Sequence, residues 1–178
     1  MSIQDRIRKI LEARKAKNEY RGLSLFEGLI DFSSNDYLGF STTKMEPNNL
    51  NFSKEKKDNK YGSTGSRLLT GNSSEIINLE AQIAAFHNAE KALVFSSGFD
   101  ANLGLISTLS RSGDVILFDS LVHASIHQGI KLSDAKSVSF KHNDIVDLER
   151  LLMENTNSNC IVICESVYSM DGDKAPLK

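Results

Sequence analysis

From residue 74 onward, short apolar runs alternate with segments in which apolar residues recur every three or four positions. The runs predict strands at 92–96, 115–118, 136–140 and 160–164, and the spaced segments predict helices near 74–88, 100–110, 122–132 and 145–155. Asn143 or Asp144 is placed to cap the last of these helices. Strands that are apolar on both faces and alternate with helices indicate an α/β fold, with a mostly parallel sheet and helices on both faces.

The first 60 residues follow a different pattern. Apolar Ile3, Ile7, Ile10 and Leu11 predict an amphipathic helix over 3–19, and a short strand is expected at 29–32. Residues 42–60 are polar and rich in Asn and Lys, which is typical of a surface connection. We therefore divide the chain into an N-terminal helix and extended segment, 1–60, and an α/β part, 61–178.

Composition indicates a globular protein with a sizeable core, because 40% of the 178 residues are hydrophobic and 25% are charged. A net charge of -2 gives no electrostatic reason to expect nucleic acid or an acidic membrane as a partner. Cys160 and Cys164 fall on one predicted strand, roughly 13 Å apart and too distant for a disulfide. With no apolar run near the ~18 residues of a membrane span and no apolar leader, we expect a cytoplasmic protein.

Three segments follow predicted strands and carry polar, Gly- or His-containing sequence: 96–102, 119–127 and 165–173. Ligand sites of parallel α/β sheets lie at the carboxyl ends of the strands, so these segments are expected to converge on one crevice. In the first segment a strand gives way to a helix at Ser97 and Gly98, where free backbone N–H groups favour an anion. Phe99 adds a ring beside it. The pattern predicts a site for a phosphate attached to a flat molecule.

The other candidate residues leave alternatives open. His123 can stack on a heterocycle, exchange protons or bind a metal, or it can simply cap the helix that follows. Ser169 offers a hydroxyl near the crevice, in a segment whose Asp-Gly pair is also a good turn. Arg67, in a Gly-rich loop without a P-loop ending, can bind an anion or pair within the loop.

Five motifs stand out along the chain: FSSNDYLG at 32–39, GSTGSR at 62–67, SGFDAN at 97–102, HAS at 123–125 and SMDGD at 169–173. They appear in the order found in the α-oxoamine synthases, and the chain resembles that family from its first helix to its last residue. These are pyridoxal-phosphate (PLP) enzymes of the aspartate-aminotransferase fold type. They condense an amino acid with an acyl-CoA thioester and release carbon dioxide.

The resemblance implies a role for each matching residue. Gly98 and Phe99 would hold the cofactor phosphate, His123 would stack on the pyridine ring, and Ser169 would hydrogen-bond the phenolic oxygen. Asn35 would contact the amino acid substrate, which His123 also helps to position, and Arg21 would contact the acyl substrate. The resemblance further implies a homodimer. The alternative function, from another class of protein, is a non-catalytic binding module that keeps the phosphate site.

The family's catalytic lysine, which forms the Schiff base, has no counterpart in this sequence. Lys174 and Lys178 follow the Asp-Gly pair and lie outside any motif that matches the lysine segment. The chain has about half the length typical of the family, so we expect the partial PLP-binding large domain, ending before that lysine. We therefore expect no catalytic residue among residues 1–178, and no condensation by this chain alone.

Overall fold

The computed structural model describes residues 1–26, 28–41 and 62–177. They belong to two compact units, one that combines Met1–Lys17 with Phe95–Lys178 and one over Asn18–Val94. The domain boundary predicted at residue 60 lies outside the described residues and stays a prediction.

The first unit contains a parallel sheet of three strands, in the order β2-β1-β3. β1 spans Asp114–Asp119, β2 Lys136–Phe140 and β3 Asn159–Ile163, and β1 pairs in parallel with both neighbours. The central strand is buried almost throughout, as expected for a strand covered on both faces. These bounds lie within one residue of three of the predicted strands, and the predicted α/β fold class is confirmed.

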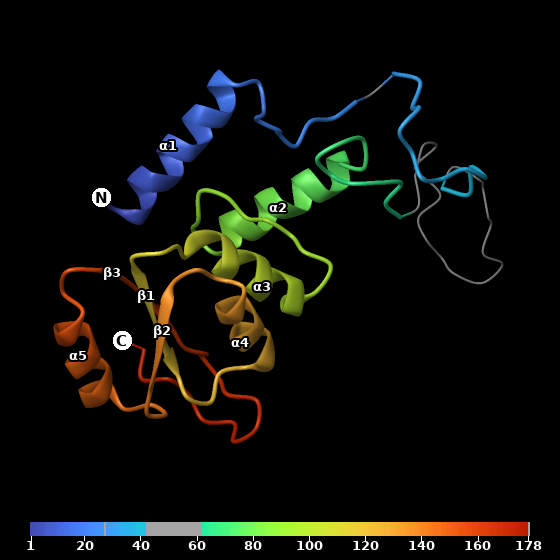
Figure 1. The fold of residues 1–178 in the computed structure, drawn as a ribbon. Coiled ribbons are helices and arrows are strands. Elements are labelled where there is room, and N and C mark those ends of the chain that lie inside the picture. The colour runs from blue at the N-terminus through green and yellow to red at the C-terminus, as the bar shows by residue number, and fades with distance from the viewer. Residues whose placement is uncertain (27, 42–61, 178) are drawn as a thin grey trace. The chain divides into compact units, whose positions relative to one another are not determined.

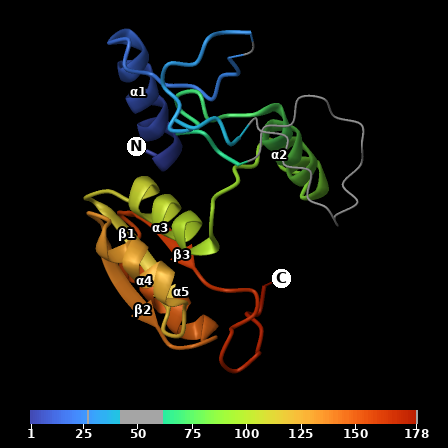
Figure 2. The ribbon, with the colours of Figure 1, turned by 90° about the vertical axis from the view of Figure 1, so that its right-hand side faces the viewer.

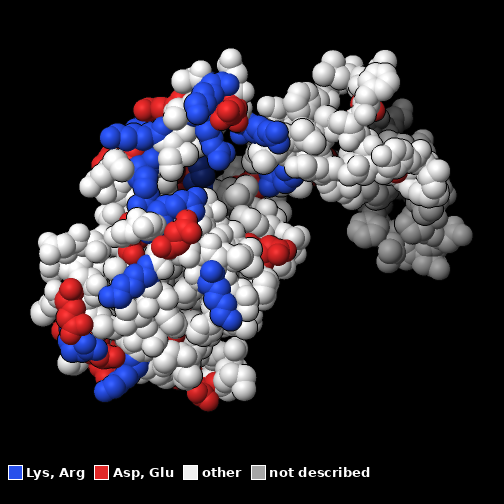
Figure 3. Space-filling view, viewed as in Figure 1, with Lys and Arg blue, Asp and Glu red and all other residues white. Residues whose placement is uncertain are grey.

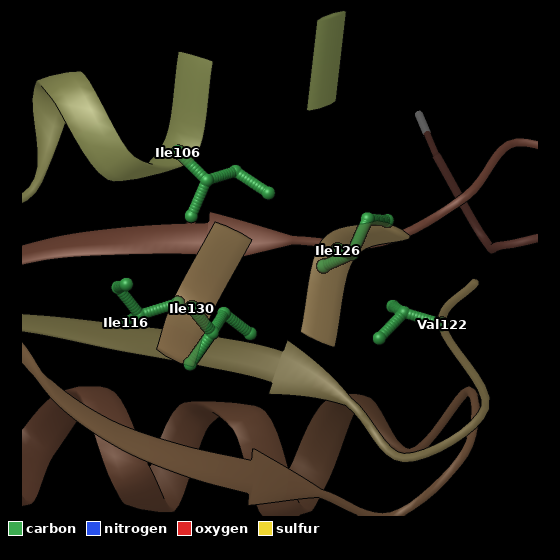
Figure 4. Close-up of a cluster of buried hydrophobic side chains, with 5 residues drawn as sticks. All are labelled: Ile106, Ile116, Val122, Ile126 and Ile130. Carbon is green, nitrogen blue, oxygen red and sulfur yellow. The ribbon is translucent and has the colours of Figure 1, made fainter. Parts of the chain in front are cut away.

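Helices cover both faces of this sheet (Figure 1). α3 (Gly98–Leu109) and α4 (Ala124–Lys131) lie on one side, and α5 (Ile145–Glu154) lies on the other. Alternate residues of β1 face opposite sides of the sheet. Ile116 packs with residues of α3 and α4, whereas Val115 and Leu117 pack with Leu151 of α5. Figure 4 shows the first cluster, which comprises Ile106, Ile116, Val122, Ile126 and Ile130.

Gly129 lets α3 and α4 approach closely. A Cβ at this position would lie 2.9 Å from Ile106 Cβ and 3.1 Å from the Asn102 carbonyl oxygen. Gly129→Ala should therefore destabilise the protein by about 1–2 kcal/mol in urea denaturation, because overpacking outweighs the gain in helix propensity. Gly104→Ala is the matched control, since its Cβ would make only an ordinary contact with Phe95. Equal stability of both variants would contradict this role of Gly129.

The N-terminal helix α1 (Ile3–Ala16) is capped by Ser2 and is tied to the sheet by an ion pair. Arg6 donates from Nη1 and Nη2 to the Asp114 carboxylate at 2.9 and 2.5 Å, and from Nη2 to the Leu109 carbonyl oxygen. The Arg6 guanidinium lowers the pKa of Asp114 to about 2 despite burial. Figure 3 shows the other basic side chains of this region on the surface, with acidic side chains among them.

In the second unit, Ser73 caps α2 (Ser74–Phe86). Arg67 donates twice to the Glu80 carboxylate, at 2.6 and 3.0 Å, and from Nε to the Asn72 side chain. Arg67 therefore pairs locally, the second of its two predicted roles. The same glycine-rich loop is tight, because a Cβ on Gly71 would lie 2.0 Å from the Gly65 carbonyl oxygen.

Two predicted strands are wrong. Residues 29–32 and 92–96 adopt no regular secondary structure. A strand needs a neighbour to accept its N–H groups. In this structure the Val94 N–H instead donates to the Glu80 carboxylate at 2.8 Å. Ile30 and Phe32 are 81% and 94% exposed, so neither side chain is buried by the described residues.

None of the described helices is long and apolar enough to cross a membrane. Cys160 and Cys164 are both free, and burial raises the pKa of the Cys164 thiol.

Candidate functional site

The N-terminus of α3 lies at the carboxyl edge of the sheet. The short segment 110–113 joins α3 to β1, so the two run in opposite directions. α3 is about 18 Å long and β1 about 20 Å. The helix therefore returns its first turn to the edge where β1 ends and α4 begins. The chain after β3 also leaves the sheet as a loop, drawn in red in Figure 2.

Two backbone donors are free at this helix end. Ser97 caps α3, and its hydroxyl accepts the Asp100 N–H at 3.0 Å. Within the described part of the chain, the N–H groups of Gly98 and Phe99 have no hydrogen-bond partner. A Cβ built on Gly98 would meet nothing within 4 Å, so the space beside this turn is open. Free N–H groups at the positive end of a helix dipole form a site for an anion.

The one acidic side chain in this turn is held by its own neighbours. The Asp100 carboxylate accepts hydrogen bonds from the hydroxyls of Ser96 and Ser97, at 2.9 and 2.8 Å. These bonds hold it against the serines that precede the helix. The carboxylate therefore does not occupy the N–H groups of Gly98 and Phe99.

His123 is the N-cap of α4, and its ring is exposed and fixed in orientation. Nδ1 accepts the Ser125 N–H at 3.1 Å and lies 2.8 Å from the Ser125 hydroxyl. Because Asn102 Nδ2 donates to that hydroxyl at 2.9 Å, the hydroxyl proton points to His123 Nδ1. The neutral ring therefore carries its proton on Nε2. The helix-capping alternative is correct, and it leaves one edge of the ring free.

These contacts join all three predicted segments. Asn102 lies one turn after Gly98 on the same face of α3, and reaches His123 through Ser125. The His123 N–H donates to the Glu165 carboxylate, at the start of the loop that carries Ser169. Ser169 itself is exposed, and its hydroxyl has no partner within the described residues. The three segments therefore meet at the carboxyl edge, as predicted, and a crevice between them stays a prediction.

A second polar cluster at this edge was not predicted. His142, just after β2, places Nδ1 2.9 Å from Asp119 Oδ1 and Nε2 2.7 Å from Asp173 Oδ2. The Asn143 backbone N–H donates to Asp119 at 2.9 Å, and its side-chain amide donates to Asp173 at 2.6 Å. Asp119 is fully buried. The rule that placed candidate residues after strands applies equally to 141–144, and would have found this cluster.

Hydrogen bonds keep the Asp119 carboxylate of this cluster ionised beside the histidine. Burial raises the pKa of Asp119, but hydrogen bonds from Asn143, Leu121 and His142 outweigh it and the net shift is downward. The Asp119 hydrogen bond raises the pKa of His142, with Asp173 acting in the same direction. Burial raises the pKa of Tyr168 to about 12, so its hydroxyl stays protonated.

The substrate residues suggested by the resemblance lie in the second unit. Asn35 donates its backbone N–H to the Thr64 carbonyl oxygen at 2.7 Å, which joins the first two motifs. It lines a polar cavity of about 300 Å³ with Asp36, Phe40, Ser41, Ser63 and Thr64. Arg21 is exposed in a segment without regular secondary structure. Both therefore stay predictions.

The alternative role of His123 as a metal ligand gains no support. Among the residues that the structure describes, no group of three His, Cys, Asp or Glu side chains is arranged to hold a metal ion. The nearest histidine along the helix, His127, packs edge-on against Phe118, with ring centroids 5.4 Å apart.

Comparison with known proteins agrees with this fold. The family model "Aminotransferase class I and II" matches residues 27–178. An 8-amino-7-oxononanoate synthase from Emericella nidulans is 39% identical over 189 residues, covering 99% of this chain and 46% of that protein. This chain thus spans about half the length of the curated relatives it matches.

Two solved structures extend the likeness to the fold. A serine palmitoyltransferase variant from S. paucimobilis with a bound PLP–myriocin aldimine is 40% identical, with a TM-score of 0.62, over 65% of this chain and 29% of that one. The 8-amino-7-oxononanoate synthase of Francisella tularensis is 33% identical, with a TM-score of 0.53, over 84% of this chain and 41% of that one.

The parallel sheet, its helices and the matched family model define an α/β protein of the aminotransferase-like fold. The chain belongs to the aminotransferase class I and II family. The predicted resemblance to PLP enzymes of this fold is confirmed, since the relatives include proteins named 8-amino-7-oxononanoate synthase.

Proposed function

We propose that this chain binds pyridoxal 5'-phosphate at the carboxyl edge of its sheet. The N–H groups of Gly98 and Phe99 hold the phosphate, His123 stacks on the pyridine ring, and Ser169 hydrogen-bonds the phenolic oxygen. The observation that carries the proposal is the pair of free backbone donors at the start of α3, beside open space.

The residues present fit this cofactor in charge and shape. A phosphate needs donors without a competing carboxylate, and Asp100 is held by Ser96 and Ser97. A flat ring needs a flat neighbour of fixed orientation, which Ser125 and Asn102 provide for His123. The solved serine palmitoyltransferase relative contains PLP, which supports the same cofactor here.

The reaction we propose is the decarboxylative condensation of L-alanine with a pimeloyl thioester, of CoA or acyl carrier protein, to 8-amino-7-oxononanoate in biotin synthesis. When bound, PLP supplies an electron sink for the negative charge that forms at the amino acid Cα. His123 holds the ring plane, Asn35 contacts the amino acid, and Arg21 contacts the acyl group. The names of the curated relatives support the product, 8-amino-7-oxononanoate. The solved serine palmitoyltransferases keep a sibling reaction, with glycine or serine, as the alternative.

We propose that the complete enzyme is a cytoplasmic homodimer. The lysine that forms the Schiff base in this family has no counterpart in the motifs of residues 1–178. The 178-residue chain should therefore release no oxoamine product from L-alanine and pimeloyl-CoA, while an assay with a complete relative proceeds. Glycine and serine are assayed in parallel. Product formed by the 178-residue chain itself would contradict this assignment.

Cofactor binding tests the site without turnover. His123→Ala should weaken PLP binding to the 178-residue chain by about five- to tenfold, because ring stacking contributes roughly 1 kcal/mol. Ser169→Ala should weaken it by about tenfold, since a hydrogen bond to a charged oxygen is lost. The measurement is a PLP titration followed by absorbance. His87→Ala, an exposed histidine at the end of α2, is the control and should leave the affinity unchanged.

Binding without turnover would fit the other candidate, a module that keeps the phosphate site but carries out no condensation. No PLP binding by the wild-type chain, or equal affinity of all four proteins, would refute the proposed site.

A further inference from the structure

The cluster around His142 has a role that the cofactor contacts do not explain. It joins the ends of two strands to the loop that follows the third: Asp119 ends β1, His142 and Asn143 follow β2, and Asp173 lies in the loop after β3. That loop carries Ser169. Holding the loop at the carboxyl edge therefore determines where the Ser169 hydroxyl lies.

Both ring nitrogens of His142 face carboxylate oxygens. An ionised carboxylate only accepts hydrogen bonds, so the contacts at 2.9 Å to Asp119 and 2.7 Å to Asp173 each need an N–H on the ring. A neutral imidazole has one N–H and would turn a lone pair toward one of the two carboxylates. Asn143 Nδ2 lies 3.3 Å from Nε2, farther away than Asp173. An imidazolium, with an N–H on each ring nitrogen, satisfies both contacts.

Packing fixes the ring in this position. Tyr168, from the same loop, is 2% exposed and packs edge-on against His142, with ring centroids 4.5 Å apart. The loop is also bonded within itself: the Tyr168 N–H donates to the Asp173 carbonyl oxygen, and the Gly172 N–H to the Tyr168 carbonyl oxygen, each at 2.9 Å. The loop is thus one compact turn, attached to the sheet through Asp173 and Tyr168.

We infer that His142 is a positioning residue, whose protonated ring clamps the Ser169 loop to the ends of β1 and β2. The inference rests on the proposed function at one point only, the contact of Ser169 with the cofactor. The groups that face the ring are Asp119 from β1, and Asp173 and Tyr168 from the loop. Asp119 and Asp173 favour the protonated ring, and Tyr168 stays neutral.

The sign of the pH dependence follows from the raised pKa of His142. A histidine whose pKa is higher in the folded than in the unfolded state stabilises the fold fully below its unfolded pKa, near 6.5. That contribution is lost as the pH rises through the folded pKa. The loop should therefore be closed near pH 6 and should open more often near pH 9.

Amide hydrogen exchange of the 178-residue chain tests the clamp without PLP. We expect the protection factors of the Tyr168 and Gly172 amides, corrected for the intrinsic exchange rate, to fall from pH 6 to pH 9, by a factor of ten for each unit by which folding raises the pKa of His142. In His142→Gln the protection should be low at both pH values. His87→Gln should behave as the wild type. Protection that does not change with pH in the wild type, or is unchanged in His142→Gln, overturns the inference.

A titration of the wild type keeps the inference testable if His142→Gln fails to fold. The His142 ring resonances should titrate above pH 6.5 by NMR, and Asp173→Asn should move that midpoint downward. A midpoint at or below 6.5 overturns the inference. Neither measurement uses the cofactor, so a failure of the clamp and a failure of PLP binding are seen separately.

Discussion

Gly98→Pro should fold normally and lose about 10- to 100-fold in PLP affinity. Gly98 is the first residue of α3, where proline is well tolerated because its missing N–H has no partner within the helix. Ser97 has φ -151° and ψ 157°, the extended conformation that a residue before proline prefers. The substitution therefore removes one donor to the phosphate and leaves the helix intact. A hydrogen bond to a charged group contributes roughly 1.5–3 kcal/mol.

Gly98→Ala is the matched control for this prediction. Alanine keeps the backbone N–H, and its Cβ enters open space. Absorbance titration with PLP should therefore show a smaller loss of affinity than in Gly98→Pro, because both backbone donors remain. Far-UV circular dichroism and urea denaturation confirm that both variants are folded. If Gly98→Pro binds PLP as tightly as Gly98→Ala, the α3 N-terminus is not the phosphate site.

Arg6→Ala should cost about 3 kcal/mol of the free energy of unfolding, measured by urea denaturation. The Asp114 side chain is 1% exposed and Arg6 only 17%, so the substitution leaves a buried carboxylate without its cation. Two weaker donors remain, Asn159 Nδ2 at 3.0 Å and the Arg111 N–H at 3.0 Å. They soften the loss but do not replace the charge.

Arg8→Ala is the control for Arg6→Ala, because Arg8 pairs with Asp5 at 3.7 Å on the exposed face of the same helix. Such a pair contributes little, and the variant should match the wild type. The ion pair also predicts an acid profile. With the Asp114 pKa lowered to about 2, its stabilisation is present above pH 3.8 and is lost as the pH falls toward 2. If Arg8→Ala and Arg6→Ala are equally destabilised, the buried pair does not hold α1 to the sheet.

The sequence pattern predicted the helices and the sheet well, because their signals are local or strongly buried. Helical spacing and a cap predicted at Asn143 or Asp144 located α5, which Asp144 caps, and continuous apolar runs located β1 and β3. The segments 92–96 and 29–32 carry similar apolar runs but adopt no strand. A strand depends on a neighbour elsewhere in the chain, which no local pattern specifies.

The site was predicted in part. The helix N-terminus at Gly98 follows from a local turn pattern, and the structure shows its two free donors. The contacts that orient His123 join residues from two helices and a loop, through Asn102, Ser125 and Glu165. The spacing of residues along the chain does not specify such contacts. His142 follows a predicted strand, as the other candidates do, so its place at this edge could be predicted, whereas its contacts could not. Its two carboxylate partners come from distant segments.

The most direct test of the central claim is the backbone amide spectrum of the chain during a titration with PLP. If the start of α3 holds the phosphate, the Gly98 and Phe99 amide protons will shift downfield, and pyridoxal without a phosphate will not reproduce those shifts. Saturable PLP binding that leaves both amides unmoved would contradict the account.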